Sequence, residues 1–260
     1  WARIAGYDVV EEPTAIRSSV GVLTEQHGLY LRMTAEEYLD FFGKVYNLDA
    51  NMRKKRSDYL LEYFGLAKDA KRRIGEYSKG MRQKLALART LIHEPPVLLL
   101  DEPLSNLDAK LRRPVREEIR QIQQNLGLTA VYVTHDQEEA MAVSDRIIVM
   151  KNAEIAQEGT PHDLYERPNS SFIADFIGDA NLIDCSVSKS KTDSTELELT
   201  TGAVFVPEVV DWSGSGKMVI RPHQISLERK KTKQGFSGEI TYAAYLGNQI
   251  QYSVKGDLGN

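Results

Sequence analysis

The chain has 260 residues, 42% of them hydrophobic and 27% charged, which is enough to bury the cores of one large domain and a smaller one. We expect a soluble protein, because no apolar run approaches the ~18 residues that a membrane-spanning helix requires. The formal net charge of -4 argues against nucleic acid as the main ligand, since no stretch gathers a basic face. The lone Cys185 excludes an intramolecular disulfide and a cysteine metal cluster, and favours a reducing compartment.

The N-terminal part of the chain predicts short strands followed by a helical insertion. Residues 2–23 are interpreted as strands joined by the segment EEPTAIRSS. From Met33 to Leu66 the apolar spacing becomes helical, and Thr34 and Glu37 form a capping-box pattern at the start. The apolar face of the first helix is predicted to consist of Tyr38, Phe41, Phe42 and Val45.

The middle of the chain alternates strand and helix. The apolar runs PVLLLDEP and TAVYVTHD flank a helical segment at 109–127, and a third apolar run, RIIVM, follows. Strand, helix and strand in this order predict a buried, mostly parallel sheet, and therefore an α/β fold.

The C-terminal part of the chain has a different pattern. After about Pro168 the sequence alternates at period two, with Gly, Ser and Lys in the turns, and this predicts a small all-β domain. We interpret residues 1–165 as the larger domain, 166–185 as a linker with one short helix at SSFIADFIG, and 186–260 as the β domain.

Two acidic residues, Asp101 and Glu102, end the first of the apolar runs. A carboxylate at this place can hold Mg²⁺, and a second one beside it can deprotonate an attacking water. Two acids at a strand end are also common as solubilising residues, so the pattern alone leaves both interpretations open.

Two further features suit phosphate chemistry. His135 ends the second apolar run and could contact a terminal phosphate, or be an ordinary surface histidine. Ser78 is a predicted N-cap of a helix that continues to Leu91, and Gly80 allows a close backbone approach. The amides at the start of that helix suit an anion, although any capped helix has the same pattern.

Four motifs between residues 77 and 136 together resemble one family. YSKGMRQ resembles the signature motif of ATP-binding-cassette (ABC) ATPases, VLLLDE their Walker B strand, SNLD their D-loop and VTHD their switch-histidine strand. The resemblance implies a P-loop NTPase-type parallel sheet with a helical subdomain, followed here by a small all-β, OB-like domain. It also implies ATP and Mg²⁺ as cofactors.

The resemblance assigns roles to these residues. Asp101 would help to hold Mg²⁺, Glu102 would be the general base for the hydrolytic water, and His135 would contact the γ-phosphate. The family closes two ATP molecules between two head-to-tail subunits, so the signature residues would contact ATP held by a second copy; they are Ser78, Lys79, Gly80 and Gln83. In the D-loop, Ser105 and Asp108 would couple the two sites.

The phosphate cradle of the family, G-x-x-x-x-G-K followed by Ser or Thr, is missing. The nearest string, DWSGSGKM, has Asp211 in place of the first Gly and Met218 in place of Ser or Thr, and we interpret it as a hairpin turn. We expect the cradle to lie upstream of Trp1 in a longer protein, and this chain alone to bind ATP poorly.

Two other positions depart from the pattern of the family. The usual Q-loop glutamine falls on Glu25, with Gln26 one residue later, so the role of Mg²⁺ ligand and link to the membrane domain attaches to one of these two. Pro114 lies within the helix after the D-loop, where a proline costs ~3 kcal/mol or kinks the helix.

The tail resembles the TOBE accessory domain found in importers of sugars, polyamines, ferric iron and sulfate. VIRPHQISL and YLGNQIQYSV resemble its strands. Residues 1 to about 103 instead resemble exporter-type cassettes, and the change falls within DEPLSNLD. Two interpretations are therefore open: the chain is a chimera of two cassettes, or it is a single divergent cassette.

The resemblance therefore implies the ATP-hydrolysing subunit of an ABC transporter, most simply an importer. Its expected partners are a second ATPase subunit, transmembrane permease subunits and a solute-binding protein, and its place is the cytoplasmic face of the membrane. The β-rich tail would be regulatory or solute-sensing. The rival hypotheses are a non-transport cassette ATPase and an inactive scaffold.

Overall fold

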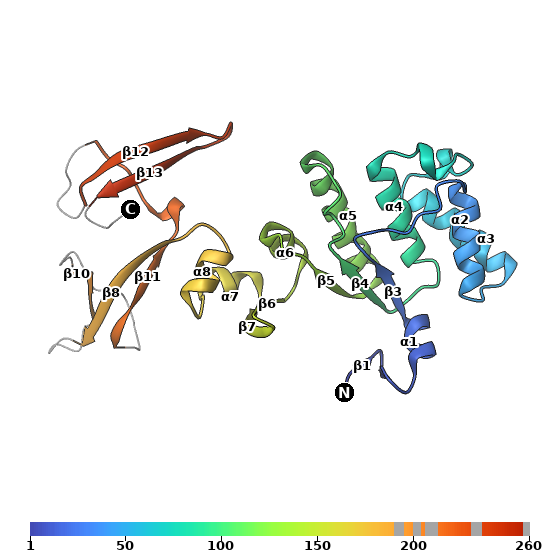
Figure 1. Ribbon diagram of the computed structural model, residues 1–260, viewed down its shortest axis with the longest axis horizontal. Helices are drawn as coiled ribbons and strands as arrows, with labels where there is room; N and C mark the ends of the chain where they lie inside the picture. Colours follow the sequence, from blue (N-terminus) through green and yellow to red (C-terminus); the bar gives the residue numbers. More distant parts are fainter. Residues whose placement is uncertain (190–194, 200–203, 206–212, 230–235, 257–260) are drawn as a thin grey trace. The chain divides into compact units, whose positions relative to one another are not determined.

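The chain forms two compact units, Trp1–Asp145 and Arg146–Asn260, in a computed structural model (Figure 1). The structure describes residues 1–189, 195–199, 204–205, 213–229 and 236–256. Within these ranges no helix is both long and apolar enough to cross a bilayer.

A three-stranded parallel sheet organises the first unit, as the sequence predicts, although its third strand is mostly exposed and not buried as expected. Its order is β3 (Val20–Leu23), β4 (Val97–Asp101) and β5 (Thr129–Val133). Parallel neighbours require a crossover, and helices supply both of them. Because the three strands point the same way, their carboxyl ends share one edge of the sheet.

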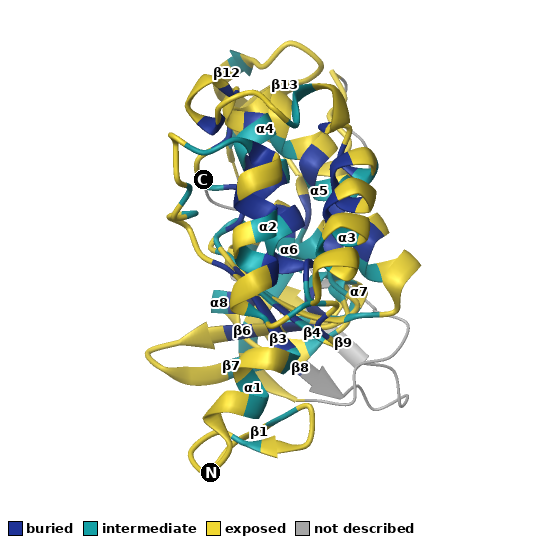
Figure 2. Cartoon of the chain, turned by 90° about the vertical axis from the view of Figure 1, so that its right-hand side faces the viewer, coloured by how far each residue is buried: buried dark blue, intermediate teal, exposed yellow. Residues whose placement is uncertain are grey.

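The helical insertion between β3 and β4 supplies most of the buried side chains of this unit. Figure 2 shows buried residues along the inner faces of its helices. Thr34 and Glu37 form the predicted capping box, with Glu37 N–H donating to Thr34 Oγ1 at 3.2 Å and Thr34 N–H donating to Glu37 Oε2 at 2.8 Å. The elements are α2 (Ala35–Val45), α3 (Ala50–Tyr63), the 3₁₀ turns η1 (Ala67–Asp69) and η2 (Ile74–Glu76), and α4 (Lys79–Thr90).

The buried face of α2 differs from the predicted one. Phe41 is 39% exposed and Val45 is 56% exposed, so these two residues are not part of the core. Ala35 and Leu39, one turn apart, are fully buried. Helical geometry then rotates Phe41 and Val45 to the edge of the buried stripe.

The segment EEPTAIRSS joins two strands, as predicted, because it lies between β2 (Tyr7–Asp8) and β3. Most of it is the helix α1 (Pro13–Ser19), which has Pro13 at its first turn. A proline is compatible with that position because the missing N–H would have no intrahelical partner there. Before it, β1 (Arg3–Ile4) and β2 (Tyr7–Asp8) form a small antiparallel hairpin.

Two helices complete the first unit, α5 (Ala109–Leu126) and α6 (Gln137–Val143). The helix α5 is continuous through Pro114, and Gly127 ends it in the left-handed conformation with φ of +62°. One face of α5 is buried and consists of Val115, Ile119 and Ile122.

The third apolar run, RIIVM, does not join the parallel sheet. It forms β6 (Ile147–Lys151), which pairs antiparallel with β7 (Glu154–Gly159) in the second unit. Asn152 and Ala153 both have positive φ, 53° and 63°. Such a two-residue turn reverses the chain at once and makes a hairpin.

Short helices and antiparallel strands form the rest of the second unit. The predicted helix at SSFIADFIG is present as α8 (Ser171–Phe176), and it follows α7 (Pro161–Glu166). One antiparallel sheet has the order β10-β9-β8-β11, and β12 pairs with β13. The bounds are β8 (Asn181–Lys189), β9 (Thr195–Leu199), β10 (Val204–Phe205), β11 (Gly214–Ile220), η3 (Pro222–Gln224), β12 (Gly238–Tyr245) and β13 (Ile250–Gly256).

The string DWSGSGKM is not a hairpin turn as predicted. Gly216 and Lys217 lie inside β11, opposite Cys185 and Asp184 of β8, whereas Asp211 is outside the described residues. Lys217 Nζ forms an ion pair with Asp184 at 2.7 Å. A phosphate cradle must open a helix, so this segment is a strand that only imitates the motif.

Candidate active site

The candidate site begins where β4 ends in Asp101 and Glu102. Asp101 lies opposite Val133 in the parallel register, so the residues after β4 and after β5 meet at one edge of the sheet. Glu102 has a φ of +46°, uncommon for a residue other than glycine, and its N–H donates to Val133 O at 2.9 Å. Such a conformation costs on the order of 1–3 kcal/mol and persists where the surroundings hold it.

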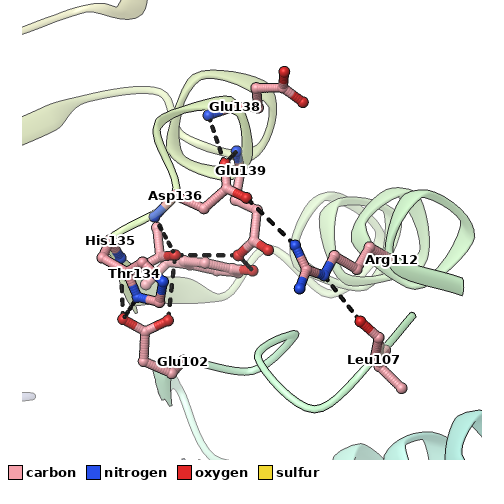
Figure 3. A network of polar contacts seen from close by, with 9 residues as sticks. Glu102, Leu107, Arg112, Thr134, His135, Asp136, Glu138 and Glu139 are labelled. Carbon is pink, nitrogen blue, oxygen red and sulfur yellow. Dashed lines mark hydrogen bonds and ion pairs between the residues drawn. The ribbon is translucent and has the colours of Figure 1, made fainter. Parts of the chain in front are cut away.

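Glu102 and His135 form the central contact of the site (Figure 3). Glu102 Oε1 accepts a hydrogen bond from the His135 backbone N–H at 3.0 Å and lies 2.7 Å from His135 Nδ1. The hydrogen bond with Glu102, and then its negative charge, raise the pKa of His135. The His135 side chain is 83% exposed and that of Glu102 only 23%. The imidazole thus covers one oxygen of a half-buried carboxylate.

A second group of polar side chains surrounds this pair. Thr134 Oγ1 lies 3.5 Å from Glu102 Oε2 and 3.2 Å from Glu139 Oε2. Asp136 caps α6 by accepting from the backbone N–H groups of Glu138 and Glu139 at 2.9 and 3.2 Å. The sequence motifs did not identify Glu139. Thr134 and Asp136, by contrast, lie within VTHD, the string that resembles the switch-histidine strand.

Arg112 connects the site to the D-loop. Its Nε donates to Leu107 O at 3.0 Å, and its guanidinium lies 3.8 Å from Asp136 Oδ2. The prediction missed this residue as well. Its only sequence signal was a basic side chain in the first turns of the helix after SNLD.

The predicted signature residues lie at the start of α4. Ser78 is the N-cap, as predicted, and its hydroxyl accepts from Met81 N–H at 3.2 Å. Lys79 is exposed, whereas Gly80 and Gln83 are buried. The Gln83 amide nitrogen donates to Pro103 O, so this side chain is engaged inside the subunit.

The D-loop residues lie between β4 and α5. Ser105 N–H donates to Glu102 O at 3.2 Å. Asp108 is the N-cap residue of α5 and its side chain is 74% exposed, 4.0 Å from Lys79 Nζ. The structure therefore brings the signature helix and the D-loop side by side at their exposed ends.

Glu25 and Gln26 follow β3 and are both exposed. Asn106 Nδ2 donates to the Glu25 carbonyl at 2.9 Å, and Thr24 Oγ1 donates to the Gln26 carbonyl at 2.7 Å. These bonds fix the backbone next to the D-loop and leave both side chains open to solvent. The geometry does not choose between the two residues.

The acidic residues suit a magnesium ion that arrives with a nucleotide. Asp101 offers one exposed carboxylate at the strand end, and Mg²⁺ commonly binds through one or two carboxylates together with substrate phosphates and water. No group of three or more His, Cys, Asp or Glu side chains is placed to hold a metal in the part of the chain that the structure describes.

Comparisons with known proteins show the family to which this chain belongs. The ABC transporter family matches residues 2–105, and the TOBE domain family matches residues 218–260. The Fe(3+) ions import ATP-binding protein of Rhizobium etli is 45% identical over 258 residues, which is 98% of this chain and 72% of that protein. The corresponding Brucella melitensis protein is 43% identical over 256 residues, with the same coverage of both chains.

A polyamine protein is also similar. The spermidine/putrescine import ATP-binding protein of Borreliella afzelii is 38% identical over 242 residues, 92% of this chain and 68% of that protein. The chain therefore belongs to the ABC transporter family. It is an ATPase of that family, with a TOBE domain at its C-terminus.

Proposed function

We propose that this chain hydrolyses ATP to drive the import of a solute of the ferric-iron or polyamine type through a membrane permease. The names of the relatives support an importer over an exporter and over a non-transport cassette. The Rhizobium etli protein aligns on both sides of DEPLSNLD, which supports a single cassette over a chimera. A second ATPase subunit, permease subunits and a solute-binding protein are the partners that this function requires.

The contact between Glu102 and His135 carries the proposed mechanism. Glu102 would take a proton from the hydrolytic water, and His135, which is favoured in its charged form beside Glu102, would face the terminal phosphate. Because His135 engages Oε1, the oxygen left for the water is Oε2, whose contact with Thr134 Oγ1 is long at 3.5 Å. Magnesium bound with ATP would supply charge neutralisation, and Asp101 would help to hold it.

The remaining assignments belong to the same proposal. Lys79 and Asp108 are exposed and close together, which supports a contact of the signature motif and D-loop with a second copy. Ser78, Gly80, Gln83 and Ser105 are assigned to that contact, and Glu25 or Gln26 to the link with the permease. We retain the division into an ATPase domain at 1–165, a linker at 166–185 and a TOBE-like domain at 186–260; the TOBE match at 218–260 supports the last of these.

Replacing Glu102 with glutamine tests the mechanism. In the full gene product reconstituted with its permease, Glu102→Gln should reduce ATP turnover and solute uptake at least about 100-fold, because a general base contributes ~10²–10⁴-fold. ATP should still bind and hold two subunits together, measured by light scattering with ATP. The matched control is Glu138→Gln, an exposed acid on α6. Turnover of Glu102→Gln within twofold of the wild type would reject Glu102 as the base.

A further inference from the structure

An open groove of about 450 Å³ lies between α5 and α6, and arginines form much of its wall. We call it the arginine groove. The lining residues are Arg113, Arg116, Glu117, Arg120, Gln121 and Ala142. None of them belongs to the candidate active site. Three arginines face a single carboxylate here, whereas the whole chain has a formal net charge of -4. The groove is therefore a basic surface on an acidic chain.

Helical spacing gathers the lining residues of α5. They recur at positions i, i+3, i+4, i+7 and i+8 and so share one face of the helix. The buried face of α5 consists of other residues, namely Val115, Ile119 and Ile122. The helix α6 packs against α5 (Figure 1) and contributes Ala142 to the groove. This short side chain leaves the space opposite the arginines open.

Arg120 forms a fixed part of the wall. Its guanidinium donates to Asp145 Oδ1 and Oδ2 at 2.5 and 3.1 Å, and to Val143 O at 3.0 Å. Asp145 and Val143 lie at the end of α6 and just after it. Arg120 thus joins the two helices, and its hydrogen-bonding capacity is largely used within the protein.

Arg113 and Arg116, by contrast, are available to a ligand. Arg113 Nε lies 3.1 Å from Glu117 Oε1, in a pair whose side chains are 79% and 59% exposed. Such an exposed pair contributes little to stability, so an incoming anion can take the place of Glu117. Arg116 is partly buried, and no carboxylate among the residues that the structure describes forms an ion pair with it. Two guanidinium groups one helical turn apart can therefore reach the same anion.

We propose that the arginine groove binds a phosphate dianion, either free or as the ester of a small molecule, and that Arg113 and Arg116 hold it together. The planar fork of arginine matches the oxygens of phosphate and carboxylate alike. A carboxylate has only two oxygens, which a single guanidinium occupies, whereas a phosphate has enough for two. The volume lies within the range of small-molecule sites, ~300–1,000 Å³.

Glu117 and Ala142 make the sign of each effect predictable. Glu117 competes with the ligand for Arg113, so Glu117→Gln should tighten binding. Ala142→Glu places a negative charge opposite the arginines and should weaken binding, although it keeps both of them. Ala142→Gln adds a side chain of the same size without the charge and is the matched control.

The test is isothermal titration calorimetry of the full gene product with inorganic phosphate and, separately, with glucose 6-phosphate. Mg²⁺ and a non-hydrolysable ATP analogue at saturation keep the ATP site occupied, and constant ionic strength keeps the screening equal. Arg116→Gln should raise the Kd about tenfold or more, the effect of losing a hydrogen bond to a charged group. Arg113→Gln should raise it about threefold, because Glu117 already engages this arginine.

The control on the same helix is Lys110→Gln, an exposed cation outside the groove, and its Kd should stay within twofold of the wild type. Equal weakening by Lys110→Gln and Arg116→Gln would show diffuse attraction and overturn the proposal. The absence of saturable binding below about 10 mM of both probes would also overturn it. Tighter binding of glucose 6-phosphate would assign an ester as the ligand, and tighter binding of inorganic phosphate would assign the free ion; both results support the site.

The variants of Ala142 keep the proposal falsifiable if Arg116→Gln folds poorly. Ala142→Glu should weaken binding at least threefold more than Ala142→Gln. Unchanged binding in Ala142→Glu would place the phosphate elsewhere and reject the groove. The proposal does not depend on Glu102 as the base, because no lining residue takes part in the proposed mechanism. Failure of either hypothesis therefore leaves the other intact.

Discussion

Two histidines of the first unit lie in opposite electrostatic surroundings. His135 is exposed beside Glu102, which raises its pKa. His93 is partly buried and stacks on Tyr46, with ring centroids 3.7 Å apart and planes at 7°. Burial, with a smaller contribution from the charge of Arg56, lowers the pKa of His93 to about 4. One histidine is thus suited to carry charge in the site, and the other to stay neutral in the core.

His93 should make the fold sensitive to acid. Its folded pKa lies below the unfolded value of about 6.5, so its contribution to stability is full above that value and is lost as the pH falls toward 4. His93→Phe keeps the stacking and removes the titration. Because solvent screens part of the effect at a partly exposed ring, the wild type should lose about 1 kcal/mol more free energy of unfolding than this variant between pH 7 and pH 5, measured by urea denaturation.

The control for that comparison is His162→Gln, which changes an exposed histidine of the second unit. It should leave the dependence of stability on pH as in the wild type. Equal acid sensitivity of the wild type and His93→Phe would contradict the assignment of the effect to the buried ring.

At the scale of elements, α5 joins β4 to β5 and therefore bears on the position of both strand ends. The helix continues through Pro114, which has no backbone N–H, so one helical hydrogen bond is missing near the start of α5. Pro114 is exposed, so packing of its side chain compensates little for the lost hydrogen bond. By contrast, Pro13 lies in the first turn of α1, where a proline is compatible with the helix.

Pro114→Ala should therefore stabilise the first unit. The substitution restores the missing N–H and removes a steric conflict worth ~3 kcal/mol, offset by up to about 1 kcal/mol from the freer unfolded chain. We expect a gain of about 1–3 kcal/mol in urea denaturation, whereas Pro13→Ala should change stability little. A Pro114→Ala protein no more stable than the wild type would show that α5 is already adapted to its proline.

Some elements could be predicted from the sequence because their signals are local. The capping box of Thr34 and Glu37, the N-cap Ser78 and the parallel pairing of β4 with β5 are all as expected. The burial of β5 is not, because most of its residues are exposed. The proximity of Glu102 to His135 also follows from the sequence, because each follows one of two parallel strands and such ends meet at one edge.

Other features depend on contacts that periodicity does not encode. The burial of Glu139 depends on Tyr132 of β5 and on Thr134, which follows that strand. An acidic residue in a polar helix therefore gave no signal in the sequence. The strand at Gly216 depends on pairing with β8, which outweighs the turn tendency of glycine. The roles of the site residues stay predictions.

At the scale of the whole molecule, one buried arginine unites the parts of the second unit. Arg221 is 3% exposed and lies 4.2 Å from the centre of the Tyr165 ring. Its guanidinium donates to the carbonyl oxygens of Ala174, Gly178, Asp179 and Tyr165 at 2.8, 2.9, 3.2 and 3.0 Å. The residue thus ties the end of β11 to α7, α8 and the segment after them.

Arg221→Lys should loosen this unit although the charge is kept. An ammonium group lacks the planar fork that reaches several carbonyls and stacks on a ring. We expect a loss of about 2–4 kcal/mol, since hydrogen bonds to charged groups contribute ~1.5–3 kcal/mol each, and faster hydrogen exchange in α7 and α8. Arg229→Lys, at an exposed position, is the control. Unchanged exchange in Arg221→Lys would show that these segments are held by their apolar contacts.

The left-handed backbone at Glu102 affects any attempt to increase the thermal stability of this protein. Glycine or asparagine would adopt the φ of +46° with less strain, so a search for thermostable variants would select against the acid at this position. Residues that impair folding and serve chemistry are a general source of conflict between stability and activity. Here the conflict arises from the φ angle of Glu102. A variant selected for higher stability should therefore be tested for ATP turnover.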